Sequence, residues 1–131
     1  MPFDGTRYES RNPALDKMDR VIDLLSDPRR WCKRQLRSPD GRYCILGAME
    51  AAGGEVELKR PILLAIEQVT GHSYAHIEAF NDHRVTTHPL VVRVLWQARE
   101  NIINGPSQAV QQRIGTWALF RQTSAKHREL A

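Results

Sequence analysis

The segment CILGAMEAAGG at residues 44–54 constrains the fold more than any other part of the chain. Larger apolar residues cover most of its sides, and Glu50 is the only charged residue before the glycine pair. A helix that is apolar nearly all round lies in the centre of a domain. We therefore predict a central helix over residues 44–52, ended by the two glycines. A seam of small residues should let a neighbouring helix approach closely, at Cys44, Gly47, Ala48 and Ala51.

Apolar residues recur at helical spacing on both sides of this segment. Asn12-Pro13 combines a capping residue with a proline at the first helical position, so a helix should begin there and run to about Leu25. The other expected helices run from Pro61 to Gly71, from Ser73 through Phe80, from near Pro89 to the Asn-Gly-Pro sequence at 104–106, and from Ser107 through Phe120.

Two interpretations are open for the segment between residues 26 and 44. Asp27-Pro28 is typical of the start of a short helix. Alternatively, residues 31–36 and 42–44 flank the turn signal SPDG at 38–41 as a small hairpin. The turn is expected under both interpretations. We predict an all-α fold, a compact bundle of five or six helices with at most one short β-hairpin around residues 31–44.

A chain of 131 residues fits one domain that can bury a core. We expect a loosely ordered N-terminus at 1–11, a helical domain at 12–104 and a C-terminal helix at 105–131. No apolar run approaches the roughly 20 residues that cross a bilayer, and the polar start lacks a signal core. We therefore expect a cytoplasmic protein without membrane contact. Its two cysteines, Cys32 and Cys44, should be reduced thiols, and a tight hairpin would place them out of register.

The net charge of +4 is concentrated in one segment. Six of the 19 basic residues lie at 29–42, against one of the 15 acidic residues, Asp40, so this segment carries +5 and the rest of the chain −1. Cations with interleaved aromatic rings can bind phosphates and stack on bases. They attract an acidic protein surface equally well. The candidate partner-binding residues are Arg29, Arg30, Trp31, Lys33, Arg34, Arg37, Arg42 and Tyr43.

A second polar concentration is FNDHRVTTHP, at residues 80–89. Asn81 and Asp82 are typical turn residues. Thr86 or Thr87 can cap the helix that Pro89 helps to start. These residues predict a joint between two helices.

The same stretch also supports a chemical interpretation. Glu50, Asp82 and His83 are candidate acid–base groups. Because imidazole binds zinc, candidate metal ligands, together with Cys32 or Cys44, are His72, His76, His83 and His88. The chain has no Cys-x-x-Cys or His-Glu-x-x-His pattern and no nucleotide fingerprint, so we expect no cofactor.

Several short features occur in a characteristic order: Trp31, the segment GRYCILGAMEAAG with its C-x-x-G-A pattern, the aromatic-Asn-Asp joint in AFND, and Thr87 before a helix bearing Val91 and Ala98. This order resembles an uncharacterised family of short bacterial and actinophage proteins, a domain of unknown function. The resemblance spans about Leu15 to Ile103. It departs from the family pattern at Leu90, where the family has an acid, and at Phe80, where Trp is more usual. It implies a helical scaffold associated with mobile elements, without a mechanism.

These features favour a small non-enzymatic binding or accessory protein that engages nucleic acid or an acidic protein surface through the basic segment. Two alternatives are open. One is a small metal-dependent or acid–base enzyme that uses Glu50, Asp82 and the histidines. The other is an oligomeric structural protein that assembles through its C-terminal helix, whose apolar side chains extend beyond a single stripe, at Val110, Ile114, Trp117, Leu119 and Phe120.

Overall fold

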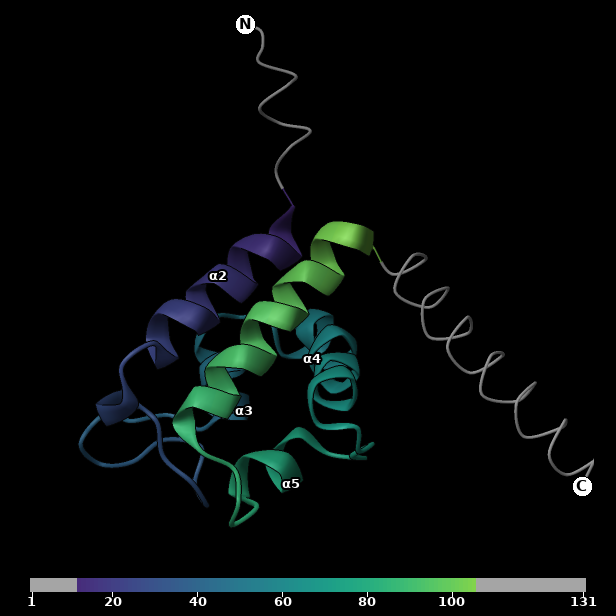
Figure 1. Ribbon diagram of the computed structural model, residues 1–131. Helices are drawn as coiled ribbons and strands as arrows, with labels where there is room; N and C mark the ends of the chain where they lie inside the picture. The colour runs from purple at the N-terminus through teal and green to yellow at the C-terminus, as the bar shows by residue number, and fades with distance from the viewer. Residues whose placement is uncertain (1–11, 106–131) are drawn as a thin grey trace, which may run out of the picture.

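Helices dominate the computed structural model, which describes residues 12–105 (Figure 1). The first, α2 (Pro13–Leu25), begins where the sequence predicts. The Asn12 side chain accepts hydrogen bonds from the backbone N–H groups of Ala14 and Leu15, at 3.0 and 3.3 Å, and so satisfies two orphan donors of the first turn. The buried side chains of α2 repeat at helical spacing, at Met18, Val21 and Leu25.

The central helix, α3 (Ile45–Ala51), lies within the predicted range, and its residues from Gly47 to Met49 are buried. At Gly47 the close neighbour is a loop and not a helix, contrary to the prediction. A Cβ built on Gly47 would lie 1.9 Å from the carbonyl oxygen of Leu36, so only glycine fits. Ala51, the last residue of the predicted seam, is exposed.

The next helix, α4 (Glu55–Thr70), shows that the prediction of a helix start at Pro61 is wrong. Pro61 lies inside the helix, where its missing N–H deprives the Glu57 carbonyl of a donor. Packing offsets that loss, because the turn before Pro61 buries Leu58 completely in the core. Carboxylates in the first turn also suit the positive end of the helix dipole. Gly71, with φ of 79°, ends the helix as predicted.

The short helix α5 (Ile77–Asp82) begins later than predicted, since His76 and not Ser73 is its N-cap. Residues 72–76 are not helical, and the Tyr74 ring meets Phe80 edge-on, with centroids 5.7 Å apart. After α5 the chain turns through residues 83–87 into the next helix, so this stretch is a helix–helix joint. The buried Thr86 hydroxyl donates to the Phe80 carbonyl at 2.8 Å and thus closes α5. Thr87, the other predicted cap, stands directly before the next helix, and its carbonyl accepts the N–H of Val91 at 3.0 Å.

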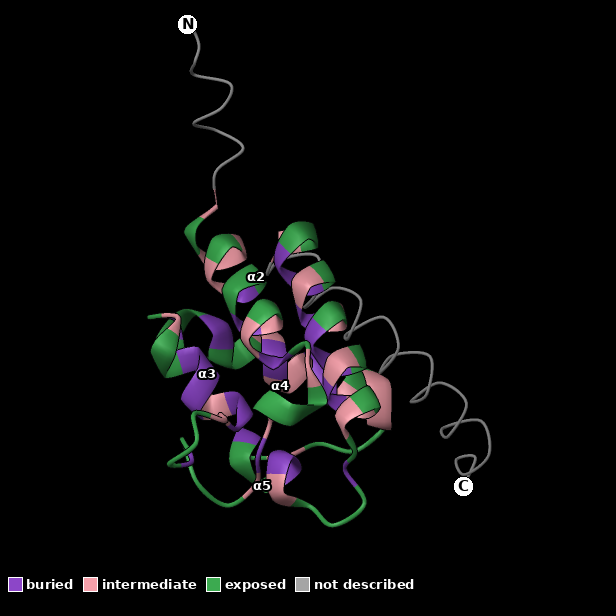
Figure 2. Ribbon diagram, turned by 90° about the vertical axis from the view of Figure 1, so that its left-hand side faces the viewer, coloured by how far each residue is buried: buried purple, intermediate pink, exposed green. Residues whose placement is uncertain are grey.

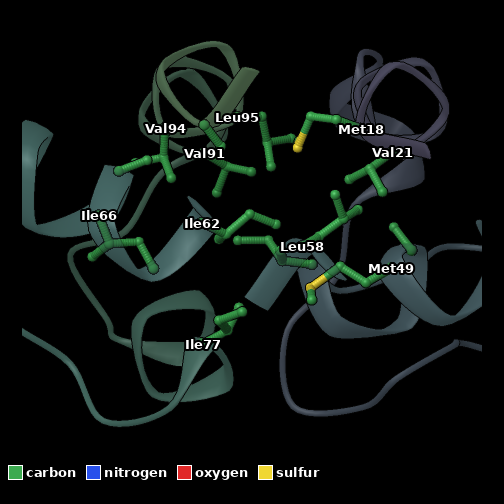
Figure 3. Packing of buried hydrophobic residues seen from close by; sticks show 14 of the residues in the cluster. Met18, Val21, Met49, Leu58, Ile62, Ile66, Ile77, Val91, Val94 and Leu95 are labelled. Carbon is green, nitrogen blue, oxygen red and sulfur yellow. The ribbon is translucent and has the colours of Figure 1, made fainter. Parts of the chain in front are cut away.

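The last described helix covers residues 88–105 and starts near Pro89 as predicted. Gly105, within the predicted break at 104–106, has a left-handed φ of 86°. It lies beside α2, to which an ion pair of 2.6 Å between Arg99 and Asp19 joins it (Figure 1). Buried residues occupy the inward faces of the helices (Figure 2). Figure 3 shows the core between the helices, built from Met18, Val21, Met49, Leu58, Ile62, Ile66, Ile77, Val91, Val94 and Leu95.

The predicted all-α fold is therefore confirmed. Between residues 26 and 44 the short helix predicted to start at Asp27-Pro28 forms only as a 3-10 helix, η1 (Pro28–Arg30), with Asp27 as its N-cap. No regular hairpin follows it, only isolated β-bridges. Among residues 12–105 no helix is long and apolar enough to cross a membrane. The predictions for residues 1–11 and for a helix after Ser107 lie outside the described residues.

Candidate functional site

The segment that joins α2 to α3, residues 26–44, carries the concentrated positive charge, and we call it the basic loop. Three short stretches of its backbone lie side by side, around Trp31, Arg37 and Tyr43, and we call them passes. The pass that holds Tyr43 lies between the other two. Tyr43 pairs in parallel with Trp31 on one side and antiparallel with Arg37 on the other. The N–H of Cys32 donates to the Tyr43 carbonyl at 2.9 Å, and the N–H of Tyr43 donates to the Arg30 carbonyl at 2.8 Å. These bridges give an irregular loop a defined backbone path.

The fully buried Asn81 of α5 holds this loop in place through its side-chain amide. Its side-chain oxygen accepts hydrogen bonds from the indole N–H of Trp31 at 2.8 Å and from the backbone N–H of Ile45 at 3.0 Å. Its amide nitrogen donates to the Cys32 carbonyl at 3.1 Å and to the Asp82 carboxylate at 2.9 Å. The amide therefore uses its two donors and both acceptor sites. One side chain joins the basic loop, the start of α3 and the end of α5.

Two further contacts from the end of α5 hold the tip of the loop. The Asp82 carboxylate accepts a hydrogen bond of 2.8 Å from the backbone N–H of Arg34. Arg34 has φ of 71°, the left-handed region that costs an ordinary side chain roughly 1–2 kcal/mol. The Lys33 ammonium donates to the His83 carbonyl at 2.8 Å. The strained conformation of Arg34 is thus fixed by tertiary contacts.

The predicted turn at residues 38–41 is present. The N–H of Gly41 donates to the Ser38 carbonyl at 3.0 Å, and Gly41 has φ of 87°. The Ser38 hydroxyl binds the Asp40 carboxylate and accepts the N–H of Arg42 at 2.9 Å. Hydrogen bonds from Ser38 and Arg42 lower the pKa of Asp40. The turn therefore keeps its only acid ionised beside Arg42.

The six cations of the loop differ in how they are neutralised. Arg29 pairs with Asp27 at 2.8 Å and lowers the pKa of Asp27 to about 2, and Arg42 pairs with Asp40 at 3.2 Å. Lys33 lies over the Trp31 ring, 5.6 Å from its centroid. Within residues 12–105 no ion pair forms at the three remaining cations, Arg30, Arg34 and Arg37, and all three are exposed.

The two aromatic residues of the loop are engaged inward. Trp31 and Tyr43 are half-buried against the hydrophobic core. The Trp31 ring also lies 6.0 Å from the His88 ring, and the Arg37 guanidinium covers Tyr43 at 5.5 Å. The exposed apolar residue of the loop is Leu36, which is 44% exposed. Of the eight residues predicted for partner binding, the aromatic pair therefore acts chiefly as a structural anchor.

The acid–base candidates fall in separate places. Glu50 is exposed on α3, whereas Asp82 and His83 lie together at the end of α5, where they hold the basic loop. His88 is half-buried, and its Nε2 lies 2.7 Å from the Leu25 carbonyl oxygen. His72 is exposed beyond α4.

His76 lines a hollow of about 220 Å³ between α3, α4 and α5. The other lining residues are Leu46, Met49, Glu55, Lys59, Ile77 and Glu78. In the part of the chain that the structure describes, no three His, Cys, Asp or Glu side chains gather as metal ligands would. Cys32 and Cys44 are both free and buried.

Sequence reasoning missed the roles of Asn81, Asp82 and Leu36. The sequence predicts local turn chemistry for Asn81 and Asp82, and acid–base chemistry for Asp82, whereas their partners Trp31, Cys32 and Arg34 lie about 50 positions earlier in the chain. The aromatic-Asn-Asp joint and the C-x-x-G-A segment were the visible signals. The structure brings these two motifs into contact: the Asn81 side-chain oxygen accepts the N–H of Ile45, the residue directly after the Cys of that segment.

Comparisons with known proteins give a family and no activity. No curated protein and no solved structure matches the chain. A family model, described as a family of unknown function, matches residues 9–101 and so covers α2 to α5, the whole basic loop and most of the last described helix. The expected membership of a family without an assigned activity is thereby confirmed: the chain belongs to DUF6197, a family of unknown function.

Proposed function

We propose that this protein is a non-enzymatic binding module that docks on an acidic surface of another protein through Arg30, Arg34, Leu36 and Arg37. One observation carries the proposal. The basic loop carries three exposed arginines that form no ion pair among the described residues, and an exposed leucine lies among them in the sequence. Hydrogen bonds to Asn81 and Asp82 of α5 fix the backbone of this loop.

A fixed backbone matters because binding costs less when the contacting residues are already ordered. Here Asn81 holds Trp31 and Cys32, and Asp82 holds Arg34 in a left-handed conformation that the side chain would not favour alone. Strained backbone of this kind gathers at ligand clamps and active sites. These contacts use the backbone of the loop, and among residues 12–105 they leave Arg30, Arg34 and Arg37 exposed and without ion pairs.

The structure favours a protein partner over a single-stranded nucleic acid. Stacking of bases on aromatic rings is a main source of affinity for single strands, and Trp31 and Tyr43 are both packed against the core. Exposed leucine contributes nothing to phosphate binding, whereas at an interface between proteins it buries apolar area beside arginine, a residue that is enriched there. Leu36 has such a position, between Arg34 and Arg37 in the chain.

Fluorescence anisotropy with defined probes tests the proposal on the full chain. The probes are a labelled acidic peptide of alternating Glu and Leu, poly-glutamate of equal charge, a single-stranded 20-mer DNA and a 20-base-pair duplex. The Glu/Leu peptide should bind most tightly, with an affinity that falls with salt. Leu36→Gln should remove its advantage over poly-glutamate.

Charge reversal supplies the matched control. The Arg34→Glu/Arg37→Glu variant should weaken binding of the Glu/Leu peptide by about tenfold or more, as expected for reversed interface charges. Arg60→Glu/Arg93→Glu changes the net charge equally at exposed positions outside the basic loop and should change binding little. Binding of the DNA probes alone, or equal losses in the two variants, would overturn the proposal.

A further inference from the structure

The two cysteines of the chain lie opposite each other in the basic loop. The parallel bridge pairs Trp31 with Tyr43, and its hydrogen bonds run from Cys32 N to the Tyr43 carbonyl and from Tyr43 N to the Arg30 carbonyl. In a parallel pair the next residues on each segment are also in register, so Cys32 stands opposite Cys44. The out-of-register placement expected for a tight hairpin holds for the antiparallel pass around the 38–41 turn, and the parallel bridge to Trp31 is a second pairing that the sequence did not indicate.

The register also places both side chains on the same side. Successive side chains of extended segments alternate between faces, so Cys32 and Cys44 share the face opposite to that of Trp31 and Tyr43. Both cysteines are buried, with exposures of 8% and 3%. Paired segments lie about 4.8 Å apart, within the range of roughly 4.4–6.8 Å between Cα atoms that a disulfide needs. The backbone of the loop already suits a bond between them.

We infer that Cys32 and Cys44 are an oxidation site that closes to an intrachain disulfide in response to peroxides. One thiolate attacks a peroxide oxygen, which breaks the O–O bond and gives a sulfenic acid and hydroxide, protonated to water. The second thiolate attacks the sulfenic sulfur and releases the second hydroxide, which takes up a proton. Two thiols and one hydrogen peroxide thus give one disulfide and two waters. The site does not depend on what the basic loop binds.

The reduced thiols have local roles that the bond would end. The Cys44 sulfur accepts the N–H of Gly47 at 3.3 Å and so caps α3, and the Cys32 thiol donates to the Gln35 carbonyl at 3.6 Å. Burial raises the pKa of both thiols. Since the thiolate is the reactive form, oxidation should be slow near neutral pH and faster as the pH rises. Closure would tie the pass that holds Trp31 to the pass that holds Tyr43.

The test treats the reduced full chain with hydrogen peroxide in buffer that contains a chelator, followed by digestion with trypsin without reductant. Cleavage after Arg30, Lys33, Arg42 and Lys59 puts the two cysteines on separate peptides. The expected product is a single linked pair that has lost two hydrogen atoms and separates again with dithiothreitol. Formation should keep the helical circular dichroism and accelerate by several-fold between pH 7 and pH 9.

Single serine variants and an unfolded control complete the test. Cys32→Ser and Cys44→Ser should each give a sulfenic acid that dimedone traps, with no intrachain link. The same oxidation in concentrated urea shows how readily the unfolded chain forms the bond. Any of three outcomes would overturn the inference. They are a disulfide between two chains, stable higher oxides at the separate cysteines, and a Cys32–Cys44 disulfide that forms only in urea.

Discussion

The helical core and the basic loop are stabilised by different kinds of interaction. In the core, side chains such as Met18, Ile62 and Leu95 are buried at helical spacing, and burial of apolar area supplies the free energy. In the basic loop, order comes from hydrogen bonds to Asn81 and Asp82 and from three short backbone passes. The bundle therefore provides stability, while the loop is a polar structure that the bundle holds in place.

The two regions meet at Asn81 and Gly47. Asn81 presents a fully hydrogen-bonded amide inside the protein, and Gly47 lets the Leu36 backbone lie directly on α3. A chain with the same apolar pattern and other residues at these two positions would still favour the bundle. It would lose the fixed path of the loop. The following substitutions separate the two contributions, from the largest expected effect to the smallest.

Removal of the amide at Asn81 should have the largest effect. Asn81→Ala breaks four hydrogen bonds and leaves the Trp31 indole N–H and the Cys32 carbonyl without a partner, which should lower the free energy of unfolding by about 4 kcal/mol. Chemical denaturation measures this loss. Asn101→Ala, the other buried asparagine, should cost less and keep the hydrogen-exchange protection of residues 30–44. Equal loss of protection would contradict the anchoring role.

A core truncation should affect stability without affecting the loop. Ile62 is fully buried on α4, and Ile62→Ala should cost about 3 kcal/mol through lost contacts and a cavity. At a temperature where the variant is folded, binding of the Glu/Leu peptide should match that of the wild type. Thermal denaturation and anisotropy measure the two properties. Parallel losses of both would show that the regions are not separable.

A methyl group at Gly47 tests the contact between loop and helix directly. Alanine favours a helix by about 1 kcal/mol over glycine, yet its Cβ would meet the Leu36 carbonyl oxygen. Overpacking should prevail, for a net loss of about 2 kcal/mol in Gly47→Ala. Chemical shifts should change at residues 33–38 and little in α4. An increase in stability would mean that the loop moves away from α3 at little cost.

Arg34→Asn should affect binding more than stability. Asparagine tolerates the left-handed conformation better than arginine, and the backbone N–H that Asp82 accepts is unchanged. The free energy of unfolding should therefore change by no more than about 0.5 kcal/mol. Affinity for the Glu/Leu peptide should fall several-fold because one cation is lost. Unchanged affinity would remove Arg34 from the proposed surface.

The smallest effect concerns acid stability at the start of the loop. The side chain and N–H of Arg29 hold the pKa of Asp27 at about 2, below its usual 3.8. A lowered pKa gives stability that is present above pH 4 and lost as the pH falls towards 2. Asp27→Asn should lose stability slightly at pH 7 and converge with the wild type near pH 2. Parallel curves across this interval would show that Asp27 contributes nothing by ionisation.

Much of the bundle could be predicted because its signals are local. The start of α2 follows from Asn12-Pro13, and the stop at Gly71 from a glycine in the left-handed region. The start of α4 could not be predicted from Pro61, since burial of Leu58 in the assembled core outweighs the proline. Ser73 is a residue type that caps helices, but residues 72–76 are not helical and α5 begins only at Ile77. The Tyr74 ring packs against Phe80 instead.

The features of the candidate site likewise fall into those that local sequence signals predict and those that depend on tertiary packing. The charge concentration and the 38–41 turn follow from neighbouring residues, so the sequence by itself determined where the cations lie and which fold class carries them. Only the tertiary structure decided that Asn81 holds Trp31, that Arg34 is strained against Asp82 and that Trp31 pairs with Tyr43. Periodicity and turn signals act within a few residues, whereas these contacts join segments whose meeting depends on how the helices pack.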